Sequence, residues 1–224
     1  MGTYKFDWSI IEKYFPELLS GLWITLQVSL VGMAIALVFG LLLAMGRLSP
    51  IGLIRVVANA ITQLFRSIPL FVMLFWVYYG LSLKFQILFT EFQAGALALG
   101  ITGGAYMAEV FRGGLMSVDP GQREASMALG VSKESTFFHV IFPQAMKIVI
   151  PPSVNVYVGL LKGATIVSVI GVSDMIYVAQ YVSLETFAPF ELYSVAGIVF
   201  VALTVSISGF AWLLERRLGR GRSE

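Results

Sequence analysis

Long apolar stretches recur along this chain of 224 residues, and the first of them, residues 21–45, contains no charged side chain. A helix needs about 20 mostly apolar residues to cross the hydrocarbon core of a bilayer. Over the whole chain 58% of the residues are hydrophobic and only 12% are charged, whereas soluble domains carry about a quarter charged residues. The sequence therefore predicts an all-α integral membrane protein embedded in the lipid bilayer.

Five transmembrane helices can be placed, at residues 21–45, 56–81, 93–115, 148–172 and 193–214. The fourth is interrupted by Pro151, Pro152, Asn155 and Lys162. With no linker, repeat or low-complexity tract, residues 1–224 are expected to form a single transmembrane domain.

The N-terminal stretch is not a cleavable signal peptide, because charged residues break it up and no compact apolar region follows a basic start. Instead Trp8, Ile11, Phe15 and Leu18 recur at helical spacing. This spacing predicts a short amphipathic helix that lies in the membrane interface.

The distribution of basic residues predicts the orientation, because cytoplasmic loops are enriched in Lys and Arg. With the N-terminus outside, the inner segments carry Arg47, Arg55, Arg112, Arg123, Lys133, Lys147, Arg216, Arg217, Arg220 and Arg222. The outer segments carry only Lys5, Lys13 and Lys84. We therefore expect the N-terminus outside, the C-terminus inside, and a cytoplasmic loop at about 116–147.

This loop has the signals of two short helices. Asp119 can cap a helix that Pro120 begins, since proline suits the first helical position. Gly130 suits the positive φ of a helix end, and Ser132 can cap the second helix. The predicted unit, a helix, a glycine bend and a helix, is longer than a simple connection requires. It is either a decorative helical hairpin or a docking element.

The loop resembles the EAA loop of ABC importer permeases, E-A-A-x3-G-x9-I-x-L-P. In this sequence Glu124, Ala125, Gly130 and Pro143 match that pattern in register, and Ser126, Val140 and Phe142 depart from it conservatively. The resemblance implies a coupling helix that docks on a cytoplasmic ATPase subunit.

Three further segments resemble the polar amino acid uptake permeases for histidine, glutamine and glutamate-aspartate. They are FRSIPL at 65–70 with FW at 75–76, AYMAEVFRGG at 105–114 and LKGATIVSVI at 161–170. The order and spacing of the four motifs match over residues 60–175, and FRSIPL with FDW at 6–8 leans toward glutamate-aspartate permeases. The family implies a type I ABC importer permease in the bacterial plasma (inner) membrane. It also implies two permeases, as two copies or as a copy and a paralogue, with ABC ATPase subunits and an external amino acid-binding protein.

Two basic residues lie at membrane depth, where charges tend to mark a pathway or a buried pair. Arg66 either pairs with Glu109 of a neighbouring span or lines the substrate passage. Glu109 and Arg112 are three residues apart and can share a helix face. Lys162 lies among polar positions, with Asn155 and Thr165, and either meets the carboxylate of a substrate or snorkels to the outer interface. Gly163 and Ala164 depart from the acidic Asp-Thr/Ser of the family.

Asp174 and the Gly171-Val172-Ser173 break are expected to end the fourth span, as a helix terminus with a capping residue. In the family this outer region faces the substrate-binding protein, so an interface role is the alternative. The chain has no cysteine and one histidine, His139. Catalytic residues, a metal site and a nucleic-acid partner are therefore not expected. A G-x-x-x-x-G-K-[ST] phosphate loop is absent from the sequence, so ATP and its Mg²⁺ are expected on a separate ATPase chain. The alternatives are an ion-gradient-driven transporter or channel subunit and a membrane-embedded enzyme, for which the sequence offers neither midplane coupling carboxylates nor a nucleophile with a base.

Overall fold

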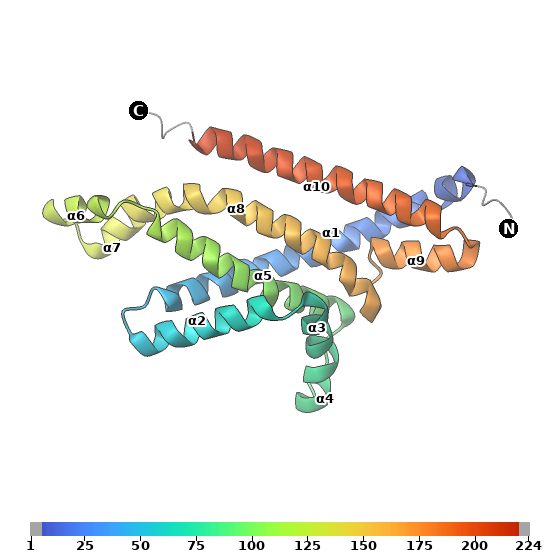
Figure 1. The fold of residues 1–224 in the computed structure, drawn as a ribbon, viewed down its shortest axis with the longest axis horizontal. Coiled ribbons are helices and arrows are strands. Elements are labelled where there is room, and N and C mark those ends of the chain that lie inside the picture. The colour runs from blue at the N-terminus through green and yellow to red at the C-terminus, as the bar shows by residue number, and fades with distance from the viewer. Residues whose placement is uncertain (1–5, 220–224) are drawn as a thin grey trace.

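The computed structural model describes residues 6–219, and every regular element in that range is a helix. The charges Lys5, Arg220 and Arg222 of the orientation argument lie outside the described residues. Four long helices run along the long axis of the molecule (Figure 1): α1 (Trp8–Arg47), α5 (Glu91–Met116), α8 (Phe142–Gly163) and α10 (Pro189–Gly219). Four helical segments are long and apolar enough to span a membrane, and a bent helix pair makes a possible fifth. The predicted all-α membrane fold is confirmed.

The N-terminal amphipathic helix is not separate, so that prediction is wrong. It is the first part of α1, whose 40 residues continue past Pro16. Ile11 and Leu18 do not face lipid, because they pack against α9 (Met175–Thr186) and the start of α10 in one apolar cluster. Helix α9 itself was not predicted. It lies at one end of the bundle, opposite the end that carries α6 (Pro120–Ala128) and α7 (Lys133–Thr136) (Figure 1).

The second span is not one continuous helix, which corrects the prediction for residues 56–81. Helix α2 (Gly52–Ser67) ends before Pro69, and the chain then turns by 103°. Ile68 is extended at φ −79° and ψ 123°, as expected for a residue that precedes proline. The segment after the bend, residues 70–85, comprises α3 (Leu70–Phe75), a π-helical turn (Trp76–Gly80) and α4 (Leu81–Phe85). We call it the arm, and it lies across the bundle direction (Figure 1).

The fourth span was predicted to be interrupted, and the structure shows instead a continuous helix over most of it. Helix α8 runs through Pro151 and Pro152 without a break, although each proline removes a backbone donor. The geometry changes only at Ala164, where a 3-10 helix (Ala164–Ile170) begins and leads to Gly171 at φ +94°. Asn155 and Lys162 therefore lie on a continuous helix rather than at a break.

Helices α1 and α5 form the most extensive contact of the bundle, and glycines make it close. A Cβ on Gly40 would lie 2.5 Å from the Met107 Cβ and 2.8 Å from the Gly104 carbonyl oxygen. A Cβ on Gly100 would lie 2.5 Å from Ile35. Small residues that let backbones approach are the usual means by which helices associate in a bilayer, where lipid tails remove the hydrophobic drive between them.

Replacing Gly40 by alanine is expected to destabilise the protein by about 2 kcal/mol, because the new methyl group meets backbone atoms that cannot rotate away. The melting temperature of the purified protein in detergent should fall by roughly 5 °C. Gly209→Ala is the matched control, since a Cβ there has nothing within 4 Å. An equal loss of stability in both variants would show that the α1–α5 approach is not the cause.

Candidate substrate pathway and coupling loop

The loop between α5 and α8 has the local structure that its sequence predicts. The Asp119 side chain accepts a hydrogen bond from the Gly121 backbone at 2.7 Å, with Pro120 as the first residue of α6. Gly130 adopts φ +77° after α6. Ser132 caps α7 by accepting from the Ser135 backbone at 3.2 Å. The chain then passes through a π-helical turn (Phe137–Ile141) into α8, with Pro143 in its first turn.

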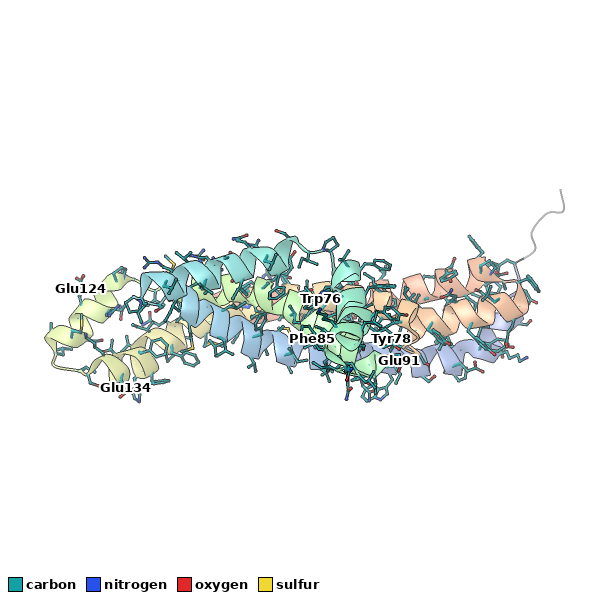
Figure 2. The ribbon with its side chains drawn as sticks, turned by 90° about the horizontal axis from the view of Figure 1, so that it is seen from below. Trp76, Tyr78, Phe85, Glu91, Glu124 and Glu134 are labelled. Atoms are coloured by element: carbon teal, nitrogen blue, oxygen red, sulfur yellow. The ribbon has the colours of Figure 1, made fainter. Side chains whose placement is uncertain are left out.

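Nearly the whole surface of α6 is uncovered. Glu124, Ala125 and Gly130 are exposed, and Leu129 is 82% exposed at the end of the helix. Only Ser126 is buried, and its hydroxyl donates to the Gln122 carbonyl at 2.9 Å. Glu124 lies at the extreme end of the molecule with Glu134 nearby, far from the arm residues Trp76 and Phe85 (Figure 2). An ordered helix at the tip of a bundle, with its apolar residue in the open, is suited to docking.

A cavity of about 610 Å³ opens where α2 ends, between α5 and α8. Its lining comprises Arg66, Ser67, Ile68, Pro69, Leu70, Thr102, Tyr106, Asn155, Val156, Gly159 and Leu160. The bend at Pro69 therefore forms one lip of the cavity. The structure brings Arg66 and Asn155, two of the predicted pathway residues, to the same space.

One carboxylate is shared by three arginines beside this cavity. Glu109 Oε1 lies 2.9 Å from Arg66 Nη1 and 3.0 Å from Arg47 Nη2, and Glu109 Oε2 lies 3.2 Å from Arg112 Nη2. The Arg66 guanidinium also lies 5.5 Å from the Tyr106 ring centroid. The two interpretations of Arg66 are thus not exclusive, because it contacts Glu109 and lines the cavity.

Arg47 is the member of this cluster that sequence reasoning missed. The sequence places it in a loop as one more inner charge, yet only 6% of its side chain is exposed. It also donates to the Asn59 side chain at 2.6 Å, which ties the end of α1 to α2 and α5. The short connection between α1 and α2 could have indicated that Arg47 is buried, because it brings Arg47 close to the middle of α2.

Lys162 and Thr165 do not line the cavity. The Lys162 side chain is exposed, on the same side of α8 as Asn155 and Gly159. Thr165 donates its hydroxyl to the Lys162 carbonyl at 2.7 Å. Both lie further along the helix from the cavity, toward α9. Among residues 6–219, no group of three or more His, Cys, Asp or Glu side chains is arranged to hold a metal ion.

Asp174 is a helix cap, as expected, but the helix that it caps is α9, which the sequence did not predict, rather than the end of the fourth span. Its Oδ1 accepts a hydrogen bond from the Tyr177 backbone at 2.9 Å. The residue is fully buried, and its Oδ2 has no partner. Next to it, the Met175 backbone donates to the Thr25 hydroxyl at 3.2 Å, and Gly21 of α1 leaves no room for a side chain against the Asp174 backbone. This junction fixes α9 against α1.

Burial raises the pKa of Asp174, which lies outside the membrane-spanning segments, from 3.8 to about 7. Between these values the folded protein holds a proton that the unfolded chain has lost, so stability falls as the pH rises from about 4 to about 7 and is then level. The total change is on the order of 4 kcal/mol. Asp174→Asn should flatten this part of the pH profile, as measured by melting temperature at pH 5 and pH 8. An unchanged profile in the variant would assign the pH dependence to other groups.

A multi-pass helical bundle with a cavity between its helices and an exposed helical loop at one end is an arrangement suited to a membrane transport subunit. The profile of the family described as "Binding-protein-dependent transport system inner membrane component" matches residues 36–220, and the chain belongs to that family. It is thus a multi-pass inner-membrane protein, and the family gives no support to a gradient-driven transporter.

Named relatives agree with this family over nearly the whole chain. A "Putative glutamine transport system permease protein" of Rickettsia felis is 34% identical over 209 residues, which are 92% of this chain and 96% of the relative. The "Probable amino-acid permease protein YxeN" of Bacillus subtilis is 33% identical over 216 residues, 96% of each chain.

Two solved structures share the fold. One is described as "Crystal structure of an amino acid ABC transporter with histidines"; it has a TM-score of 0.88 and 36% identity, over 96% of this chain and 100% of that one. An inward-facing structure of the methionine ABC transporter MetNI has a TM-score of 0.69 at 20% identity, over 91% of this chain and 98% of that one. The fold is that of the permeases of type I ABC importers.

Proposed function

We propose that this chain is the permease subunit of an ATP-driven amino acid importer. The observation that carries the proposal is the exposed unit of α6, Gly130 and α7 at one end of a bundle of the binding-protein-dependent transport family. Relatives named for glutamine and amino acid transport support the substrate class. The chain itself performs no hydrolysis, and ATP with Mg²⁺ binds to a partner ATPase subunit.

The orientation and partners follow from that role. The N-terminus is outside, and the loop at about 116–147 is cytoplasmic, where Glu124, Ala125, Ser126, Gly130 and Pro143 dock on the ATPase subunit. An external binding protein delivers the substrate to the opposite end. A second permease, a copy or a paralogue, completes the passage, because the cavity is open on one side and five spans are few for a sealed pathway.

The substrate pathway passes through the cavity. Arg66 and Asn155 line it, and Lys162 of α8 and Thr165 of the following 3-10 helix continue toward the outer end. The Arg66 Nε atom and the Thr102 hydroxyl are buried without a hydrogen-bond partner. Donors of this kind are costly unless an acceptor reaches them, and a substrate carboxylate supplies one.

The charge around the cavity favours an acidic amino acid. Three arginines share Glu109, so this cluster carries two positive charges in excess, and the cavity lining contains no aspartate or glutamate. A cationic side chain would find no acceptor of opposite charge there, whereas glutamate or aspartate brings two carboxylates. This charge distribution agrees with the resemblance of the FRSIPL and FDW segments to glutamate-aspartate permeases.

Binding of radiolabelled amino acids to the complex of permease and ATPase, without the binding protein, tests this selectivity. We expect glutamate and aspartate to compete at least tenfold better than arginine or lysine. Arg66→Gln should remove most of that preference, while Arg112→Gln, the control at the same carboxylate, should retain it. Stronger competition by arginine would contradict the acidic assignment and leave the transport role standing.

A further inference from the structure

A small pocket lies within the loop, between α6 and α7 with the turn that follows. Its volume is about 180 Å³, and it is lined by Arg123, Met127, Lys133, Thr136, Phe137 and Ile141. At a liquid volume of about 30 Å³ per water molecule, this is room for about six waters, and therefore for one protein side chain. The pocket is separate from the membrane cavity, since α6 and α7 lie at the far end of the bundle (Figure 1).

Thr136 lines this pocket and has an unused hydroxyl group. The residue is 1% exposed, yet its Oγ1 has no hydrogen-bond partner. A buried helical threonine or serine normally donates to the carbonyl four residues earlier, as Thr25 and Thr62 do at 3.1 Å and 2.8 Å. Thr136 does not, although its position in the helix offers the same acceptor. A ligand that accepts a hydrogen bond would satisfy it.

Two cations line the same pocket as Thr136. Arg123 comes from α6 and Lys133 from α7, and neither forms an ion pair with any of the described residues. Hydrogen bonds from such cations to a carboxylate are about twice as strong as bonds between neutral groups. Met127, Phe137 and Ile141 provide apolar wall along which a side-chain stem can lie.

The surroundings indicate that the occupant belongs to a protein. Leu129 is 82% exposed and Phe138 is 59% exposed on the same loop. A partner that covers these apolar residues would exclude water from the pocket, and contacts that exclude water strengthen the polar contacts they enclose. A free anion would leave the apolar residues in water.

We propose that this pocket receives the carboxylate of an aspartate or glutamate side chain of the ATPase subunit. The proposal rests on the proposed function, and it adds to the docking of α6 a second, reciprocal contact in which the permease is the receptor. Thr136 donates to the carboxylate, and Arg123 and Lys133 neutralise it. The loop then holds its partner both by an inserted helix and by an accepted side chain.

The affinity of the purified permease for its ATPase subunit, titrated in nanodiscs at two salt concentrations, tests the proposal. Thr136→Val keeps the shape and removes the hydroxyl, so it should weaken binding about fivefold without lowering the melting temperature. The double variant Arg123→Gln/Lys133→Gln should weaken binding at least tenfold and reduce its salt dependence. Lys147→Gln, which removes an exposed cation of α8, should change the affinity less than twofold.

Wild-type affinity in both pocket variants would overturn the proposal. So would inorganic phosphate that binds the isolated permease through the same residues while the affinity for the ATPase subunit is unchanged. Leu129→Asp separates this failure from that of the proposed function, because it should abolish docking whether or not the pocket is used. If Leu129→Asp also binds normally, the loop is not the docking element at all.

Discussion

Gly130→Pro is expected to reduce substrate-stimulated ATP hydrolysis by the assembled transporter at least tenfold. Gly130 adopts φ +77°, and proline fixes φ near −65°. The bend between α6 and α7 therefore cannot form, and α6 no longer meets the ATPase subunit in its correct direction. Side-chain crowding is not the cause, since a Cβ at this position has nothing within 4 Å.

Gly130→Asn is the matched control, because asparagine tolerates the left-handed conformation better than other residues do. It should retain most of the stimulation. Glu124→Arg, which leaves the bend intact and reverses an exposed charge of α6, should also reduce stimulation. If Gly130→Pro is inserted in the membrane and couples normally, α6 does not transmit ATP hydrolysis.

Glu109→Ala is expected to destabilise the protein by roughly 3 kcal/mol, because it leaves the buried Arg47 without its carboxylate. Arg47 has 6% of its side chain exposed, and it links α1, α2 and α5 through Glu109 and Asn59. Arg47→Ala should have a similar effect. The measurement is the melting temperature in detergent, together with the yield of inserted protein.

Arg112→Ala provides the comparison for this cluster. Its side chain is 35% exposed and lies one helical turn from Glu109, so its contribution should be about 0.5 kcal/mol. If Glu109→Ala and Arg112→Ala destabilise the protein equally, the loss of stability does not come from leaving the buried Arg47 without its carboxylate.

Local signals predicted local structure well. Asp119, Pro120, Gly130 and Ser132 act on the residues next to them, and all four have the predicted role in the loop. The apolar spans followed from length and hydropathy alone. Pro69 was the signal for the bend in the second span, but a hydropathy pattern that continues across it masked the break.

Properties that depend on neighbouring helices could not be read in the same way. Pro151 and Pro152 favour a break, yet α8, which packs against α5 and α10, continues through them. From the sequence, Leu18 was assigned to the apolar face of an interfacial helix. In the structure it packs in one cluster with Met175 and Leu192, which are more than 150 residues away in the sequence and could not be recognised as its partners. For the same reason a charge count assigns Arg47 to a loop, although the fold buries it beside Glu109.

The candidate site was predicted in part. Arg66 and Asn155 were selected as polar residues at membrane depth, and the fold places both in one cavity. Lys162 and Thr165 were selected by the same rule, yet they lie outside the cavity, near the end of α8 and in the 3-10 helix that follows it. Helical phase and depth decide which side chains meet. Thr102 and Tyr106 also line the cavity but were not predicted as pathway residues, because neither side chain is charged.

The coupling of ATP hydrolysis to transport is measured by uptake into proteoliposomes that contain the permease, its ATPase subunit and the external binding protein. We expect a labelled amino acid to accumulate on the ATPase-bearing side only with ATP and to stimulate hydrolysis. Gly130→Pro should abolish both effects, and Gly130→Asn should not. Accumulation that requires an ion gradient and ignores ATP, with Gly130→Pro fully active, would contradict this coupling.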